Sequence, residues 1–139
     1  MPMTASTSDV DLYSLELTDD PEVQNDVFLK IFNSGDGAAF DNLYRDDAIS
    51  NLTGSPLSGE ARTKGIIELL AKGPTLNSVV KHSYTADDVT LIVVDFELGL
   101  PGEDGELVQI KGSCTDVIRR VENGKWLMAV DRPVADITV

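Results

Sequence analysis

Hydrophobic and polar residues follow two different periods along the chain, and the change comes at Pro74. Before Pro74, apolar residues recur at spacings of three and four, which is typical of amphipathic helices. The clearest pattern predicts a helix that begins at Pro21 and ends before Gly35. Asp19 or Asp20 can cap its start, proline suits its first position, and glycine is a common residue just beyond a helix end.

Two further helices are expected before the strands begin. Asp36 can cap one over residues 37–48, and another covers residues 58–72, where Gly73 and Pro74 can stop it. Between them, the segment 47–56 predicts a short strand followed by a turn.

After Pro74 apolar and polar residues alternate, and β-branched and aromatic residues become frequent, which predicts strands. Four such runs cover residues 77–85, 87–98, 106–121 and 125–133. Turn-forming residues separate them. Helices followed by an antiparallel meander predict an α+β fold, with the helices packed on one face of a curved sheet. We expect one domain over residues 1–139, in which residues 1–12 form a flexible tail.

Alternation also predicts which side chains share a face of the sheet. In the last run it separates two sets: Trp126, Met128 and Val130 against Leu127, Ala129 and Asp131. In the run before it, Asp116 shares a face with the apolar residues Ile110, Cys114 and Ile118. Both faces of the sheet therefore carry apolar residues, whereas three short helices can cover only one. We expect a second copy of the chain to cover the other face, giving a homodimer.

Charge and composition exclude several classes of partner. The formal net charge is −13 at pH 7, so nucleic acids and anionic membrane surfaces would repel the chain. A helix that crosses a bilayer needs a run of about eighteen apolar residues, and the sequence contains no such run. The single cysteine, Cys114, rules out an internal disulfide and a multi-cysteine zinc site. The first residues lack the basic start and apolar core of a signal peptide, so we expect a cytoplasmic protein.

Three features in this order resemble one known superfamily. They are the segment YRDDA (residues 44–48), Gly59 before the third helix, and the hairpin TDVIRR-x₃-GKW that begins at Thr115. Over roughly residues 21–134 the chain resembles the nuclear-transport-factor-like superfamily, and in particular its SnoaL-like and calcium/calmodulin-kinase-association-domain-like bacterial members. The resemblance implies a cone-shaped α+β domain with a pocket between helices and sheet, commonly dimeric through the outer face of the sheet.

Members of this superfamily include ketosteroid isomerases, polyketide cyclases and limonene-epoxide hydrolases, so the resemblance does not fix one function. We expect a small apolar, carbonyl-bearing ligand and, if the protein is an enzyme, isomerisation, cyclisation or hydration without a cofactor. The alternative is a non-catalytic ligand-binding or dimerisation module.

The resemblance places Asn51 where ketosteroid isomerases carry their aspartate base, three residues before a glycine, here Gly54. An amide cannot accept that proton near neutral pH. The first helix also offers Phe28 and Phe32 where such an isomerase supplies a tyrosine hydroxyl. We therefore expect negligible steroid isomerisation. Asn51 is interpreted either as a hydrogen-bond donor to a ligand or as a turn residue.

Asp131 is the candidate catalytic acid or base, because polyketide cyclases and epoxide hydrolases of this fold use an aspartate on a late strand. A carboxyl group in an apolar cone has a raised pKa, which suits proton transfer near pH 7. The alternative is an acid at a strand end, paired with Arg132 or Arg119. Asp116 is interpreted as structural, with Arg119, Arg120 or Arg132 as its partner.

Four further residues are candidate ligand contacts: Tyr84, Asp95, His82 and Trp126. For Asp95 the alternative is solvent exposure, because Val93 stands where epoxide hydrolases of this fold have an arginine. His82 could shuttle protons together with Tyr84 or be solvated, and as the only histidine it cannot build a metal site alone. Cys114 is interpreted as a core residue.

Overall fold

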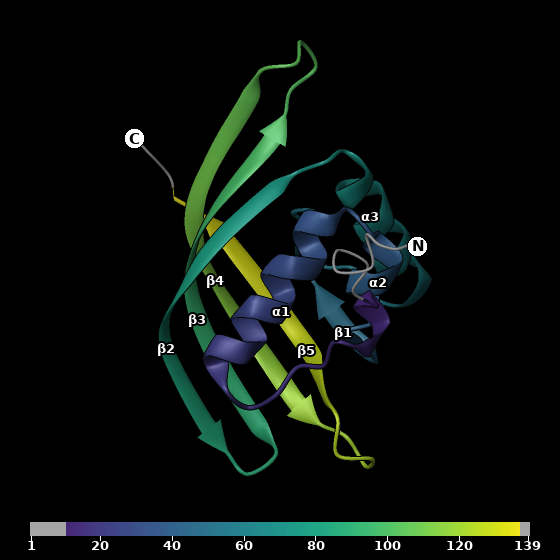
Figure 1. Ribbon diagram of the computed structural model, residues 1–139, viewed down its shortest axis with the longest axis vertical. Coiled ribbons are helices and arrows are strands. Elements are labelled where there is room, and N and C mark those ends of the chain that lie inside the picture. Colours follow the sequence, from purple (N-terminus) through teal and green to yellow (C-terminus); the bar gives the residue numbers. More distant parts are fainter. Residues whose placement is uncertain (1–10, 137–139) are drawn as a thin grey trace, which may run out of the picture.

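A computed structural model describes residues 11–136, and Figure 1 shows its helices on one side of a curved sheet. The elements follow one another as η2 (Leu12–Ser14), α1 (Pro21–Ser34), α2 (Gly37–Asp41), β1 (Tyr44–Ser50), α3 (Gly59–Ala71), β2 (Thr75–Ala86), β3 (Val89–Pro101), β4 (Leu107–Arg120) and β5 (Trp126–Ala135). The sheet has the order β1-β5-β4-β3-β2. Strands β2 to β5 form the expected antiparallel meander, and β1 adds to β5 in parallel, so the sheet is mixed. The α+β fold class is confirmed.

The caps of α1 are those that the sequence predicts. The Asp20 side chain accepts hydrogen bonds from the backbone N–H groups of Glu22 and Val23, Pro21 is the first helical residue, and Gly35 ends the helix with φ 81°. A left-handed φ of this kind favours glycine, because a side chain would be strained there.

Helix α2 is shorter than predicted and ends at Asp41 instead of residue 48. From Tyr44 onward the chain is already strand β1, and Tyr44 lies opposite Met128 of β5. Pairing with a strand more than eighty residues away outweighs the local helical pattern, which is only a weak preference. The third helix agrees with its prediction to within a residue at each end.

Two irregularities in the sheet decide which side chains face the helices. On β5, Val130 pairs with Val117 and Met128 with Ile118, so Ala129 is an extra residue that forms a β-bulge. Because of the bulge, Met128 and Asp131 both point inward, whereas simple alternation separates them. On β1 the register with β5 shifts between Tyr44 and Ile49, so residues 45–48 leave the regular ladder.

The core lies between α1, α2, α3 and the inner face of the sheet. Its centre includes fully buried side chains from helix and strand, among them Ile31, Ile92, Ile118 and Met128. Of the expected flexible tail, Asp11 caps η2 and Leu12 packs against the rim of this core, while residues 1–10 lie outside the described residues. Within residues 11–136, no helix is both long and apolar enough to cross a membrane.

Candidate functional site

A cavity of about 700 Å³ lies between the helices and the inner face of the sheet. Four phenylalanines contribute to its wall: Phe28, Phe32, Phe40 and Phe96. Leu98, Leu100 and Ile110 extend the apolar lining along β3 and β4. Glu68 of α3 and Lys72, the residue just after this helix, contribute charged groups. The cavity is therefore a largely apolar container, and its few polar groups are where chemistry or specific recognition would occur.

Two of those polar groups are carboxyl groups placed side by side. Asp116 of β4 and Asp131 of β5 are directly opposite each other in the antiparallel ladder, and both line the cavity. They are 3 % and 1 % exposed. Directly opposed residues have Cβ atoms about 5 Å apart, so the two carboxyl groups interact strongly. In the described part of the chain neither acid forms a salt bridge.

Asp131 is surrounded by hydrogen-bond donors. The Tyr44 hydroxyl donates to its Oδ2, and the backbone N–H of Asn51 donates to its Oδ1 at 2.7 Å. The Asn51 side-chain Nδ2 also donates to the backbone carbonyl of Asp131 at 2.9 Å. Burial raises the pKa of Asp131, and the Tyr44 and Asn51 hydrogen bonds oppose that rise because they stabilise the carboxylate.

Asp116 has a poorer set of donors. Among residues 11–136, the one hydrogen bond to its Oδ1 is the weak bond from the Cys114 thiol at 3.3 Å. Burial and, second, the negative charge of Asp131 raise the pKa of Asp116 to about 8. Burial likewise raises the pKa of the Cys114 thiol, so this sulfur stays protonated and is no nucleophile. The two acids therefore differ in their surroundings: the donors around Asp131 favour its carboxylate form, whereas burial and the neighbouring Asp131 favour the protonated form of Asp116.

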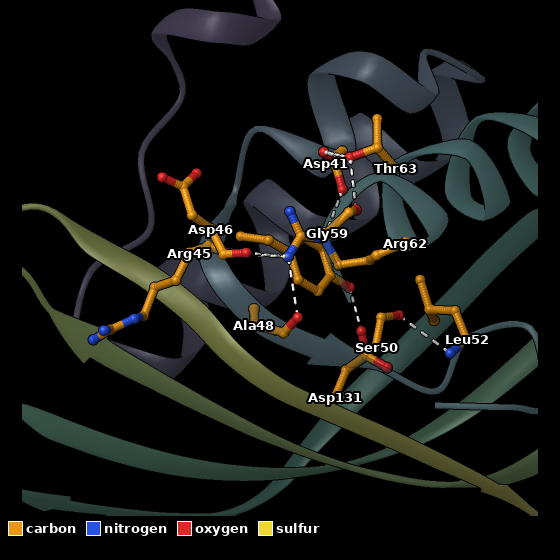
Figure 2. A network of polar contacts seen from close by, with 11 residues as sticks. Asp41, Arg45, Asp46, Ala48, Ser50, Leu52, Gly59, Arg62, Thr63 and Asp131 are labelled. Carbon is orange, nitrogen blue, oxygen red and sulfur yellow. Dashed lines mark hydrogen bonds and ion pairs between the residues drawn. The ribbon is translucent and has the colours of Figure 1, made fainter. Parts of the chain in front are cut away.

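A buried arginine supports the other side of Tyr44. Arg62 of α3 is 4 % exposed, and its Nε donates to Asp41 Oδ1 at 2.9 Å. Its Nη1 donates to the backbone carbonyls of Arg45 at 2.9 Å and Ala48 at 3.0 Å, within the part of β1 that leaves the ladder (Figure 2). Those carbonyls would otherwise lack strand partners, so Arg62 stabilises the irregular course of β1.

Arg62 also lies over the ring of Tyr44, with its guanidinium carbon 5.4 Å from the ring centroid. This cation–π contact fixes the ring from the side away from the cavity. The positive charge of Arg62 further favours the carboxylate form of Asp131, toward which the Tyr44 hydroxyl points. A continuous set of contacts therefore runs from Asp41 through Arg62 and Tyr44 to Asp131.

Of the residues that the sequence nominates, the structure brings Asp131 and Asn51 to the cavity. His82, Tyr84 and Asp95 are not in its wall. His82 and Tyr84 are opposite Val93 and Leu91, on the face turned away from Ile92, and Tyr84 is 66 % exposed. The physical reason is alternation: on β2 the inward positions are the neighbours Ser83 and Thr85, which are opposite Ile92 and Thr90 of β3.

The other two nominated residues have ordinary structural surroundings. Asp95 is exposed and lies 3.8 Å from Lys81 Nζ. Trp126 packs at the edge of the core, bridges to Leu17 and carries Arg120 over its ring, but it does not line the cavity. Tyr84, Asp95, His82 and Trp126 therefore lie outside the wall of this cavity, and a role for them in ligand binding stays a prediction.

Asp116 is the residue whose role the sequence interpretation missed. It does share the buried face of Ile118 and Cys114 as alternation predicts, but no arginine of the described part of the chain pairs with it. Arg119 lies 3.5 Å from Asp88 and Arg120 3.9 Å from Asp87, both at the exposed end of the hairpin. The sequence does carry one signal for Asp116, which is an acid in a row of apolar residues on one face of a strand. An acid buried without a cation is a candidate functional group.

Comparison with known proteins shows the fold. No protein-family model matches the sequence, and no curated protein matches it significantly. Among solved structures, a protein from Xanthomonas campestris described as a calcium/calmodulin-dependent protein kinase II association domain is 18 % identical, with a TM-score of 0.70, over 91 % of this chain and 98 % of that one. A ketosteroid isomerase-like protein from Erwinia carotovora is 15 % identical, with a TM-score of 0.73, over 85 % and 95 % of the two chains.

A nuclear transport factor 2-like superfamily protein from Salmonella enterica is 13 % identical, with a TM-score of 0.66, over 80 % of this chain and 84 % of that one. Identities this low show the fold alone. The chain thus has the nuclear transport factor 2-like, cone-shaped α+β fold, as the sequence resemblance predicts. Which of the many activities found on this fold it performs must come from the cavity.

Proposed function

We propose that the protein binds a small apolar, carbonyl-bearing molecule in this cavity and that the Asp116–Asp131 pair moves a proton on it without a cofactor. The observation that supports this most is the geometry of the pair: two buried acids are directly opposite each other in the cavity, and one accepts hydrogen bonds from Tyr44 and Asn51 whereas the other accepts from the Cys114 thiol. A neutral carboxyl group can donate a hydrogen bond to a carbonyl oxygen, and a carboxylate can accept a proton. Neither group is neutralised by an arginine within residues 11–136.

In the proposed step, Asp131 takes a proton from the carbon next to the ligand carbonyl. The electron pair of that C–H bond forms the C=C bond of an enol-like intermediate, and Asp116 donates a hydrogen bond to the oxygen on which charge develops. Return of the proton from Asp131 to the same or another carbon completes exchange or isomerisation. Cyclisation and hydration would use the same two roles. Tyr44 and Asn51 hold Asp131 in place.

Exchange of α-protons for deuterium tests the step without knowledge of the natural substrate. The probe is 2-tetralone, an apolar bicyclic ketone, followed by proton NMR in deuterated buffer. We expect exchange above the buffer rate, a loss of about 10²–10⁴-fold in Asp131→Asn, and no change in His82→Ala, which alters a polar residue outside the cavity. Because the step needs protonated Asp116, the rate should fall as pH rises above about 8.

Absence of exchange while the ketone still binds would instead support the second candidate, a non-catalytic binding module. One observation favours that candidate: both oxygens of Asp131 already accept hydrogen bonds from the protein. In such a module the acid pair would serve only to orient a ligand.

We further propose that the protein is a homodimer through the outer face of the sheet and is located in the cytoplasm. The outer face exposes apolar side chains from several strands, namely Val79, Val130 and Val134. Light scattering at micromolar concentration should report twice the 15.0 kDa chain mass, and Val130→Asp should shift the protein toward monomer. A monomeric wild-type protein would contradict the dimer and leave the cavity proposal untouched.

A further inference from the structure

A second polar group lies in the cavity wall at the contact between α1 and β2. Ser78 Oγ donates to Asn25 Oδ1 at 2.6 Å, and Asn25 Nδ2 donates to the Ser78 backbone carbonyl at 3.1 Å. Both residues line the cavity, and Asn25 is buried. They interrupt a wall that is otherwise apolar on this side, where Phe28 and Leu76 are neighbours in the lining.

A nearby pair shows what a purely structural contact between the same elements looks like. Asn33, two turns further along α1, donates to the Leu76 carbonyl at 2.9 Å and accepts from the Leu76 N–H at 2.7 Å. That amide satisfies the free backbone groups of the edge strand, is exposed, and does not line the cavity. Asn33 therefore joins α1 to β2 at a point outside the cavity wall.

The Asn25–Ser78 pair keeps hydrogen-bonding capacity after its internal contacts are counted. An amide nitrogen carries two N–H groups and a hydroxyl oxygen has two lone pairs, so one donor of Asn25 and the acceptor sites of Ser78 are unused. One adjacent donor and acceptor match a ligand hydroxyl group, which accepts and donates at once. A ketone would use only the donor.

The Asn25–Ser78 pair and the Asp116–Asp131 pair lie well apart in the cavity. Ser78 is in register with Phe96, which is in register with Gly112, and Asp116 follows four residues later on the same strand. At about 3.3 Å per residue and about 4.8 Å between strands, the two backbone positions are separated by roughly 16 Å before their side chains reach inward. One ring cannot contact both groups.

We infer that Asn25 and Ser78 form a distal hydroxyl-binding subsite, so that the ligand is an elongated molecule of at least two rings with an oxygen acceptor at the acid pair and a hydroxyl group at its far end. This inference rests on the proposed function, because the acid pair is taken as the other anchor. The inference adds a substrate class to the proposed function: the ligand has an apolar body with an oxygen at each end.

Two rigid probes test the subsite, 4-phenylphenol and 4,4′-biphenol, with binding measured by calorimetry at pH 6.5. The biphenol should bind about five- to tenfold more tightly, which corresponds to one additional neutral hydrogen bond and exceeds the twofold statistical advantage of a symmetric molecule. Ser78→Ala should reduce that advantage to twofold. Ser83→Ala, on the same strand and outside the cavity wall, and Asn33→Ala, which removes the structural contact, should both retain it.

The outcomes separate the two proposals. If both probes bind, Asp116→Leu weakens both, and the biphenol has no advantage beyond twofold in the wild-type protein, the subsite is wrong and the acid pair remains a ligand anchor. If Ser83→Ala or Asn33→Ala removes the advantage as fully as Ser78→Ala, the effect is general loosening and the subsite is again wrong. If neither probe binds, or Asp116→Leu has no effect, the acid pair is not an anchor and both proposals are overturned.

Discussion

The inner and outer faces of the sheet carry the same kind of residue in different surroundings. On the outer face Asp95 and Glu97 of β3 are exposed, 3.8 Å and 3.5 Å from Lys81 and Lys111. On the inner face Asp116 and Asp131 are buried against each other without a lysine or arginine in salt-bridge contact among the described residues. The difference shows that the chemistry of an aspartate here depends on the parity of its position in a strand. Successive residues of a strand face opposite sides of the sheet, so an aspartate moved by one position would pass from solvent into the cavity, where burial raises its pKa.

Two arginine–aspartate ion pairs of equal length differ in the same way in their exposure to solvent. Arg45 and Arg62 each have Nε 2.9 Å from an aspartate oxygen. Arg45 is partly exposed and its partner Asp47 is exposed, whereas Arg62 is buried, Asp41 is largely covered, and Arg62 also donates to the backbone of β1. Distance alone therefore does not rank these two ion pairs.

The largest expected effect comes from removing the buried arginine. Arg62→Ala should lower the free energy of unfolding by about 3–5 kcal/mol, because it removes the cation from Asp41, which keeps its Thr63 hydrogen bond, and removes the donor of the Arg45 and Ala48 carbonyls. Arg45→Ala, the matched exposed variant, should cost less than about 1 kcal/mol. Urea unfolding of both variants measures this, and equal losses would remove the distinction between the two ion pairs.

A smaller effect should appear as a pH dependence of stability. The pKa of Asp116 is about 8 in the folded protein, above its ordinary value, so the folded state binds the proton more tightly than the unfolded state. The resulting stabilisation is complete at acidic pH and is lost as pH rises toward and through 8. We expect a loss on the order of 3 kcal/mol between pH 5 and pH 8.

Asp116→Asn removes the titrating proton and should flatten that part of the profile. The matched change on the outer face, Asp95→Asn, should leave the slope of the wild-type protein in place, because Asp95 is exposed. A profile in Asp116→Asn as steep as in the wild type would show that the inner acids do not differ from the outer ones in the way described.

The smallest of the three effects concerns the donor that holds the charged acid. Tyr44→Phe deletes the hydroxyl that donates to Asp131 and should lower the free energy of unfolding by about 1–3 kcal/mol at pH 7. It should also raise the pKa of Asp131, which carbon-13 NMR of the side-chain carboxyl groups can follow. Tyr84→Phe, which removes a hydroxyl from the outer face, should change neither quantity; a pKa of Asp131 unaltered by Tyr44→Phe would contradict the assigned contact.

Local signals in the sequence were enough for the helices and the meander. Asp20, Pro21 and Gly35 bound α1 as their capping chemistry predicts, and the turn residues separate β2 to β5. Local signals do not predict where β1 begins, because its start is set by pairing with β5 across the fold. Residue type also does not give the phase of β2 relative to β3, which places Tyr84 and His82 on the outer face of the sheet.

Local sequence signals also do not give the surroundings of Asp116 and Asp131. Simple alternation separates Met128 from Asp131, yet the structure turns both inward because Ala129 is an extra residue in β5. Nothing local in the sequence marks this bulge. The partner of Asp116 could not be predicted either, since nearby arginines are frequent in the hairpin but point to its exposed end.

The extra residue in β5 bears on how related sequences should be aligned with this one. Here the inward acid follows the inward methionine by three positions, Met128 to Asp131. In a relative whose final strand is straight, the equivalent acid would follow by two, because alternate residues of a regular strand share a face. A gapless alignment would set that acid against Val130 and record a valine where a carboxyl group is in fact retained. A one-residue gap at Ala129 restores the match, so conservation of the pair has to be judged by position on the sheet.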